Sequence, residues 1–150
     1  MNNNIIETTE NKRILLQNKI KTGHVLRDKY FKKMCQCNTF NNRIDTVILT
    51  TSTIGTTLIL SSIPTINPII TIIGVIFTGI SAIASSLQKG ADTRNKYESY
   101  RNTYLQLNGI ISEYNSKLIH NHISAVEYCE LIDHFNKEYQ LIIESARPIK

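Results

Sequence analysis

The 150-residue chain has no tryptophan and contains only three cysteines, three prolines and six glycines. Three cysteines are too few for the disulfide framework of a small secreted scaffold. The low glycine count and the abundance of isoleucine and leucine exclude collagen-like and intrinsically disordered chains. The glycines do not cluster into a phosphate-binding loop, and no nucleophile–base–acid set or paired carboxylate motif is visible. We therefore expect a single domain, or a domain with tails, that has no enzymatic activity and no cofactor.

Charge is missing from one long stretch of the chain. Residues 1–45 carry nine Lys or Arg and four Asp or Glu, and residues 89–150 carry eight of each sign. Residues 46–88, 43 positions in all, carry none. The net charge of +5 therefore lies entirely on the N-terminal side of an uncharged block.

The uncharged block is long enough for two membrane spans, since 18 or more mainly apolar residues suffice for one. Pro64 pushes the residue before it out of helical geometry, and Asn67 followed by Pro68 is a good helix start. We predict transmembrane helices over 46–63 and 68–87, joined by a turn at 64–67, with Asp45 capping the first helix. The predicted fold class is all-α, a membrane protein with a two-helix transmembrane hairpin and flanking amphipathic cytosolic helices.

A soluble helical bundle that buries the hairpin is the alternative, because nine of the eighteen residues in 46–63 are Ser or Thr. Against it, the outer faces of soluble helices need charged residues, and neither predicted span has any.

Cations flank the block on both sides, and the turn has none. The positive-inside rule then places both termini in the cytoplasm. Residues 1–25 lack the compact apolar stretch of a signal peptide. We expect the flanking cations to contact anionic lipid head groups rather than nucleic acid. The candidate head-group contacts are Lys29, Lys32, Lys33, Arg43 and Lys89.

The hydroxyl side chains of the first predicted span lie on one helix face, here called the hydroxyl stripe: Thr46, Thr50, Thr53, Thr57 and Ser61. The second span has a thinner face of small residues: Thr71, Gly74, Thr78, Ser81 and Ser85. Two such faces permit close helix packing, in the hairpin or in an oligomer. The other interpretation is that the hydroxyl stripe lines a narrow, weakly selective pore.

The clearest periodic pattern follows the second span, in a predicted helix over 88–119. Its apolar residues keep an unbroken 3-4-3-4-3-4 spacing, which defines the aromatic seam: Tyr97, Tyr100, Tyr104, Leu107, Ile111, Tyr114 and Leu118. Both intramolecular packing and a homo-oligomeric coiled coil fit this pattern.

Amphipathic segments are also predicted before the uncharged block and after the helix over 88–119. An amphipathic juxtamembrane region over 13–45 is the candidate partner of the seam, through the stripe Leu26, Tyr30, Met34, Cys37, Phe40 and Ile44. Residues 1–12 read as a loose polar tail. A C-terminal helix over 124–147 begins at a capping box formed by Ser124 and Glu127.

Two further groups of residues have the chemistry of candidate sites. Cys35 and Cys37 lie shortly before the first span, where S-palmitoylation would attach the chain to the cytoplasmic leaflet, although simple packing or a metal or redox role also fits. His120 and His122 lie in a predicted loop and lack the further ligands that a zinc site needs. We predict no metal site.

The order of these segments resembles the SLATT domain, a cytosol-facing module of two transmembrane helices followed by a long helix. The resemblance covers residues 24–149 and is carried by the stretch 69–118, which includes Ile80-Ser81-Ala82-Ile83-Ala84-Ser85-Ser86-Leu87, Ala91-Asp92-Thr93-Arg94-Asn95-Lys96-Tyr97, Tyr104-Leu105-Gln106-Leu107 and Ile111. The tail from Glu130-Leu131-Ile132 through Glu144-Ser145-Ala146-Arg147-Pro148-Ile149 looks like the short helix and proline that close many members.

The resemblance implies a membrane effector that oligomerises and breaches membranes after a nucleotide-linked sensor acts. We expect no sensor domain to be fused to this module, and stand-alone relatives of this kind look to occur in large DNA viruses. Two functions thus remain: an oligomeric pore-forming or membrane-perturbing module, or a scaffolding protein of a membrane such as a virion internal membrane, whose partners are other copies, a sensor or a protein shell.

Overall fold

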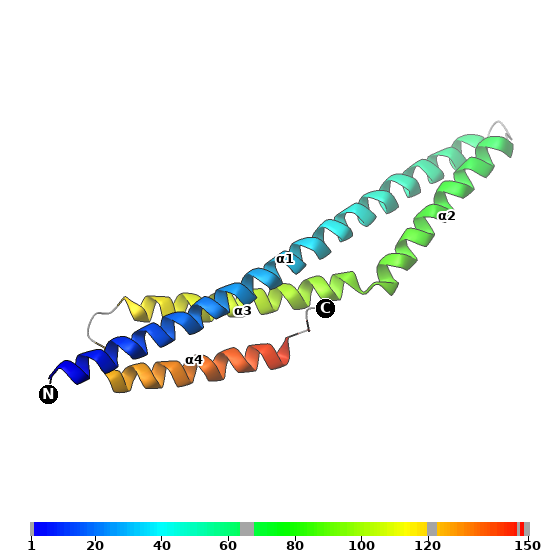
Figure 1. Ribbon diagram of the computed structural model, residues 1–150. Helices are drawn as coiled ribbons and strands as arrows, with labels where there is room; N and C mark the ends of the chain where they lie inside the picture. The colour runs from blue at the N-terminus through cyan, green and yellow to red at the C-terminus, as the bar shows by residue number, and fades with distance from the viewer. Residues whose placement is uncertain (1, 64–67, 120–122, 147, 149–150) are drawn as a thin grey trace. The chain divides into compact units, whose positions relative to one another are not determined.

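The computed structural model describes residues 2–63, 68–119, 123–146 and 148. These residues form four helices and no strand: α1 (Asn2–Ser62), α2 (Pro68–Gly90), α3 (Thr93–Leu118) and α4 (Ala125–Ser145) (Figure 1). The predicted all-helical class is confirmed. The predicted turn at 64–67 and the pair His120 and His122 lie outside the described residues.

Helix α1 runs for 61 residues without a break. Its sequence contains no proline, and its only glycines are Gly23 and Gly55, so nothing in it stops a helix that has begun. Three predictions were therefore wrong. Residues 2–12 are helical rather than a loose tail, no boundary separates 13–45 from 46–63, and Asp45 lies inside a helix instead of capping one.

The boundary between α2 and α3 also differs from the prediction. Helix α2 continues to Gly90, and α3 begins at Thr93 rather than at residue 88. Asp92 has a φ of 52°, a left-handed conformation that Asp tolerates better than most residues. Its carboxylate accepts a hydrogen bond from the Asn95 side-chain amide, and its backbone carbonyl accepts one from the Lys96 amide. Asp92 thereby ends one helix and starts the next.

The chain divides into two compact units. The first unit, the three-helix unit, contains residues 1–34 and 98–150; the second contains residues 35–97. The core of the three-helix unit comes from all three of its helices: Leu16, Ile20, Ile111, Tyr114, Tyr128, Ile132 and Phe135.

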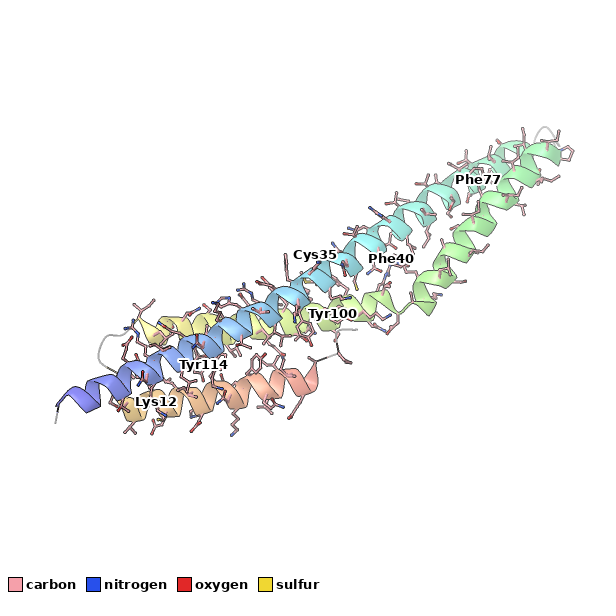
Figure 2. The ribbon with its side chains drawn as sticks, in the orientation of Figure 1. Lys12, Cys35, Phe40, Phe77, Tyr100 and Tyr114 are labelled. Carbon is pink, nitrogen blue, oxygen red and sulfur yellow. The ribbon has the colours of Figure 1, made fainter. Side chains whose placement is uncertain are left out.

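Helices α1 and α3 pack closely within the three-helix unit. The rings of Tyr30 and Tyr100 lie 6.0 Å apart, and those of Phe31 and Tyr104 lie 5.3 Å apart. One turn before Tyr30 on α1, Arg27 donates a hydrogen bond to the Asn108 side-chain oxygen at 3.3 Å. Tyr100 and Tyr114 both lie on α3 (Figure 2).

The burial of the aromatic seam varies along α3. Its central members Tyr100, Leu107, Ile111 and Tyr114 are buried, whereas Tyr97, Tyr104 and Leu118 are half-buried. On α1, of the predicted stripe only Tyr30 is buried. Phe40 is 43% exposed, and the chain instead buries Leu16 and Ile20, which the sequence interpretation did not name.

Helix α4 begins as predicted. Ser124 has extended backbone geometry, its hydroxyl accepts from the Glu127 amide, and the Glu127 carboxylate accepts from the Ser124 amide at 2.7 Å. The hydrogen bonds that the Glu127 carboxylate accepts from Ser124, chiefly from its backbone amide, lower the pKa of Glu127. The predicted capping box is therefore present, and α4 ends at Ser145, two residues short of the predicted end.

Candidate membrane-spanning helix pair

The second unit contains the C-terminal part of α1, all of α2 and the start of α3. Helices α1 and α2 are each long and apolar enough to cross a membrane. The most apolar 18-residue window has a mean hydropathy of 1.3 in α1 and 2.1 in α2. Only 6% of the first window and 17% of the second are buried, which is unlike the mostly buried core helix of a soluble protein.

The outer face of α2 is apolar and exposed. Eight of its Ile, Val and Leu side chains are at least 41% exposed: Ile69, Ile72, Ile73, Val75, Ile76, Ile80, Ile83 and Leu87. Large contiguous apolar patches are rare on monomeric soluble proteins and mark membrane or protein contacts.

Contacts between α1 and α2 follow a seven-residue repeat in each helix. On α1 the repeat is Ile48, Gly55 and Ser62, preceded by Asn41, which bonds to Thr93 of α3; on α2 it is Gly74, Ser81 and Gln88. All of these are buried except Ile48, which is half-buried. A seven-residue repeat is typical of helices that pack along their length at a small crossing angle. Contacting residues follow each other in opposite chain order, because Ile48 contacts Ser81 while Ser62 contacts Thr71.

The closest approach occurs where two glycines meet. An ideal Cβ on Gly55 would lie 2.6 Å from Thr78 Oγ1 and 2.9 Å from the Gly74 carbonyl oxygen. An ideal Cβ on Gly74 would lie 2.7 Å from Ile59 Cγ1 and 3.0 Å from the Gly55 carbonyl oxygen. Small residues permit this backbone approach, which is the usual way in which helices associate in lipid.

Hydroxyl groups add hydrogen bonds between the two helices. Ser81 donates to the Ile48 carbonyl oxygen at 3.3 Å, and Thr71 donates to the Ser62 hydroxyl at 2.8 Å. Other hydroxyls of the same face bond within α2, where Thr78 and Ser85 donate to carbonyls four residues earlier. Within a membrane these bonds satisfy polar groups that water cannot reach.

A cluster of polar side chains closes the pair at the end where the charged sequence resumes; we call it the Asp45 cluster (Asn41, Asp45, Gln88, Thr93 and Arg94). The Asp45 carboxylate accepts from the Gln88 amide at 3.0 Å and from the Arg94 guanidinium at 2.9 Å. Thr93 donates to the Asn41 side-chain oxygen at 2.5 Å. Asn41, Gln88 and Thr93 are buried, so their hydrogen bonds satisfy groups removed from water.

Electrostatics in the Asp45 cluster favour the charged carboxylate. The Gln88 hydrogen bond is the main cause that lowers the pKa of Asp45, and the Arg94 hydrogen bond and charge lower it further. Asp45 of α1 is therefore hydrogen-bonded to α2 through Gln88 and to the first turn of α3 through Arg94. This is the position where the sequence predicted a helix cap.

The hydroxyl stripe lies on a different face of α1 from the one that contacts α2. All five of its members are exposed: Thr46, Thr50, Thr53, Thr57 and Ser61. Thr46, Thr53 and Ser61 each donate to a backbone carbonyl three or four positions earlier, at 2.8, 2.8 and 3.0 Å. Such back-bonding lets a hydroxyl face an apolar medium without an unsatisfied donor.

The small-residue face of α2 does meet α1. Gly74 and Ser81 are buried there, Thr71 and Ser85 are half-buried, and Thr78 touches Gly55 through its hydroxyl while remaining exposed overall. The sequence interpretation missed the α1 partners of this face. The seven-residue spacing of Ile48, Gly55 and Ser62 is the signal for them in the sequence, whereas the hydroxyl stripe, which has a similar helical spacing, lies on another face of α1.

The remaining candidate residues occupy various positions on the surface. Lys29, Lys32, Arg43 and Lys89 are exposed, and Lys33 is half-buried. Cys35, which is labelled in Figure 2, is exposed, and Cys37 is half-buried; both are free thiols on α1. Within the described residues, no group of three or more His, Cys, Asp or Glu side chains is arranged to hold a metal ion.

Comparison of the chain with models of known families, with curated proteins and with solved structures finds no match.

Proposed function

We propose that the protein is an integral membrane protein in which α2 and residues 46–63 form a transmembrane hairpin. One observation carries this proposal: the two helices have 43 uncharged residues between them and leave most of their apolar surface exposed after packing on each other. In water this exposure is costly, at about 25 cal/mol per Å² of apolar surface. In a bilayer the same surface meets acyl chains.

In this proposal both ends of the hairpin return to the cytoplasm. Arg43 precedes the first span, and Lys89 and Arg94 follow the second, while residues 64–67 contain no cation. The Asp45 cluster then lies at the head-group level, where water and lipid phosphates lower the cost of its polar groups.

We propose further that the hairpins oligomerise through the hydroxyl stripe and conduct or perturb the membrane. The two exposed surfaces of the pair differ: α2 presents mainly Ile, Val and Leu, which suit lipid, whereas α1 presents the five hydroxyls beside the exposed side chains of Val47, Leu49, Ile54 and Leu60. Hydroxyl faces associate in membranes by interhelical hydrogen bonds and close packing. The resemblance of residues 69–118 to the SLATT domain supports this effector role.

Alkaline carbonate extraction tests the first part, because integral proteins stay in the membrane pellet and peripheral ones are released. Recovery of the protein in the supernatant would contradict a hairpin that spans the bilayer.

Leakage of dye from liposomes tests conduction. The triple variant Thr50→Leu, Thr53→Leu, Thr57→Leu should insert normally and lose leakage. The matched control Ile72→Leu, Ile76→Leu, Ile83→Leu changes three exposed α2 residues and should leak like the natural protein. Dye-tight liposomes at high protein density would rule out the conducting function.

A scaffolding role is the second candidate, favoured by the size of the three-helix unit and its exposed apolar side chains. Leu105, Val126 and Leu141 are 49%, 69% and 57% exposed on a unit that already has its own core. Such a surface suits contact with a protein shell beside a membrane, for example in a virion. Stoichiometric presence in purified particles, without any change in membrane permeability on expression, would favour this role over the first.

A further inference from the structure

The three-helix unit contains an open groove between α1 and α3 that the proposed membrane function does not use. Its volume is about 690 Å³, within the usual range of roughly 300–1,000 Å³ for small-molecule sites. Arg13, Gln17, Lys21 and His24 line it from α1, and Asn115 lines it from α3. We call it the basic groove.

The four α1 residues share one helix face because they are spaced by four, four and three positions. Arg13 and Lys21 lie two turns apart, about 12 Å along the axis, with Gln17 between them. All four side chains carry N–H donors, and so does the Asn115 amide. The basic groove therefore presents donors of hydrogen bonds along its length.

The charge around the basic groove is strongly positive. From residue 11 to residue 27, α1 carries five Lys or Arg and no Asp or Glu. None of the eight side chains that line the groove is acidic. The nearest recorded carboxylate contact is that of Glu10, whose oxygen lies 3.8 Å from an Arg13 nitrogen in a largely exposed pair. Within the described residues, no ion pair involves Lys21.

Arg13 also has hydrogen-bonding capacity that the described part of the chain leaves unused. Its Nε atom is enclosed and has no hydrogen-bond partner. Buried donors normally have a protein or water partner, so an unpaired one calls for an explanation. A groove lined by a guanidinium, an amine and two side-chain amides suits an anionic group that accepts several hydrogen bonds at once.

The groove also has an apolar part. Ile20 forms its buried floor, Leu118 is half-buried, and Ile119 at its edge is 76% exposed. A simple inorganic anion would leave this surface in water. An anion that carries a ring or short apolar chain would cover it.

We propose that the basic groove binds a small organic phosphate, with the phosphate held by Arg13, Lys21 and the neighbouring amides and the organic part against Leu118 and Ile119. This site is independent of the transmembrane function proposed above. It makes the three-helix unit a ligand-binding unit.

Isothermal titration calorimetry on the full chain in uncharged maltoside micelles tests the proposal, with empty micelles as the blank. The probe is 1-naphthyl phosphate, and 1-naphthol is its uncharged counterpart. Saturable binding of the phosphate, at least tenfold tighter than any binding of naphthol, is expected. A second arm uses dihexanoyl phosphatidate, a short-chain lipid with the same phosphate group. Tighter binding of the lipid would identify a lipid head group as the natural source of the phosphate, and tighter binding of naphthyl phosphate would identify a soluble ester.

Substitutions of residues that line the basic groove test whether naphthyl phosphate binds there. Lys21→Gln and Arg13→Gln should each weaken binding of naphthyl phosphate at least fivefold, and Asn115→Ala should weaken it less. Lys137→Gln is the matched control, since it removes one exposed positive charge from α4, outside the groove. Equal affinity in Lys21→Gln and Lys137→Gln, with unchanged helicity, would overturn the proposal, as would the absence of any binding heat.

Discussion

Gly55 of α1 and Gly74 of α2 lie so close that a Cβ on either one would approach the other's carbonyl oxygen to 3.0 Å or less. Neither contact can be relieved by a rotating side chain, because the obstructing atom belongs to the backbone. The spacing of the two long helices in the second unit is therefore determined by two residues without side chains.

Enlarging either glycine should force the pair apart. Gly55→Val and Gly74→Val are expected to lower the free energy of unfolding in micelles by about 1–3 kcal/mol, the usual cost of overpacking. A disulfide between Ile48→Cys and Ser81→Cys should form readily in the natural background and poorly in these variants. Gly79→Ala is the control, because its Cβ would meet nothing within 4 Å and alanine favours the helix. If Gly55→Val left both the stability and the cross-link unchanged, the close packing described here would be wrong.

Stability of the second unit should depend on pH through Asp45. The pKa of Asp45 is lowered by Gln88 and Arg94, so folding favours the charged form. This contribution is fully present above the unfolded pKa of about 3.8 and is lost as the pH falls through the lower folded value. Asp45→Asn should therefore show a smaller drop in thermal midpoint than the natural protein when the pH is lowered below about 4.

Asp133→Asn on α4 removes an exposed carboxylate and serves as the comparison for Asp45→Asn. It should keep the acid sensitivity of the natural protein. An identical acid response in the Asp45→Asn and Asp133→Asn variants would show that Asp45 makes no such contribution.

Tyr114 and Glu138 form a polar contact inside the three-helix unit. Burial raises the pKa of Tyr114 to about 12, and the Glu138 charge and its hydrogen bond from the tyrosine hydroxyl raise it as well. The other carboxylate oxygen of Glu138, Oε2, is buried and has no hydrogen-bond partner among the described residues. The Tyr114 hydroxyl is therefore a polar neighbour of the half-buried Glu138 carboxylate.

Removing the Tyr114 hydroxyl should therefore cost more than an ordinary hydrogen bond. Tyr114→Phe keeps the ring that packs edge-on against Phe135 at 5.2 Å, and should lose about 1.5–3 kcal/mol of stability. The double variant Tyr114→Phe, Glu138→Leu should recover part of that loss. Tyr104→Phe is the control, with an expected loss below about 0.5 kcal/mol. Equal effects of the two Tyr→Phe changes in thermal denaturation would contradict the contact.

The same tyrosine should give an alkaline transition. Because the folded pKa of Tyr114 is raised above the unfolded value of about 10, its stabilising contribution is complete below pH 10 and is lost as the pH rises toward 12. The pKa values of Tyr30 and Tyr139 are also raised by burial, so an ultraviolet titration should show a late component to which Tyr114 contributes, together with unfolding. In Tyr114→Phe this late component should be smaller by one tyrosine; an unchanged amplitude would show that Tyr114 does not contribute to it.

The capping box of α4 should be worth about 1 kcal/mol. Ser124→Ala removes the hydroxyl that accepts from the Glu127 amide, and N-cap replacements of this kind cost about 0.5–2 kcal/mol. Ser116→Ala in the last turns of α3 removes a hydroxyl that bonds within its own helix, and should be neutral or slightly stabilising. Chemical denaturation of the two variants decides the point, and a Ser124→Ala midpoint equal to that of Ser116→Ala would refute it.

Several elements were predictable because their causes are local. The start of α4 depends on Ser124 and Glu127, three residues apart, and the start of α2 depends on Pro68. Gly74 and Ser81, which share the small-residue face of α2, are both buried. Periodicity reports which residues share a helix face.

Other features were not predictable because they depend on distant partners. The hydroxyl stripe and the Gly55 face have similar helical spacing, and only the position of α2 distinguishes the one that is buried. Asp45 has the residue type of a helix cap, yet α1 continues through it because no proline or glycine interrupts the chain nearby. Its carboxylate accepts hydrogen bonds from Gln88 and Arg94, which lie more than 40 residues away in sequence.

The sequence alone determined that the chain is helical, that residues 46–88 carry no charge, that α2 begins at Pro68 and that α4 begins after the capping box. These follow from backbone sterics and local hydrogen bonding, which act over a few residues. Only the tertiary structure decided which face of α1 meets α2, what Asp45 binds, and which cationic side chains line the basic groove. Those outcomes depend on how closely two helix backbones can approach, and that distance is determined by both helices together.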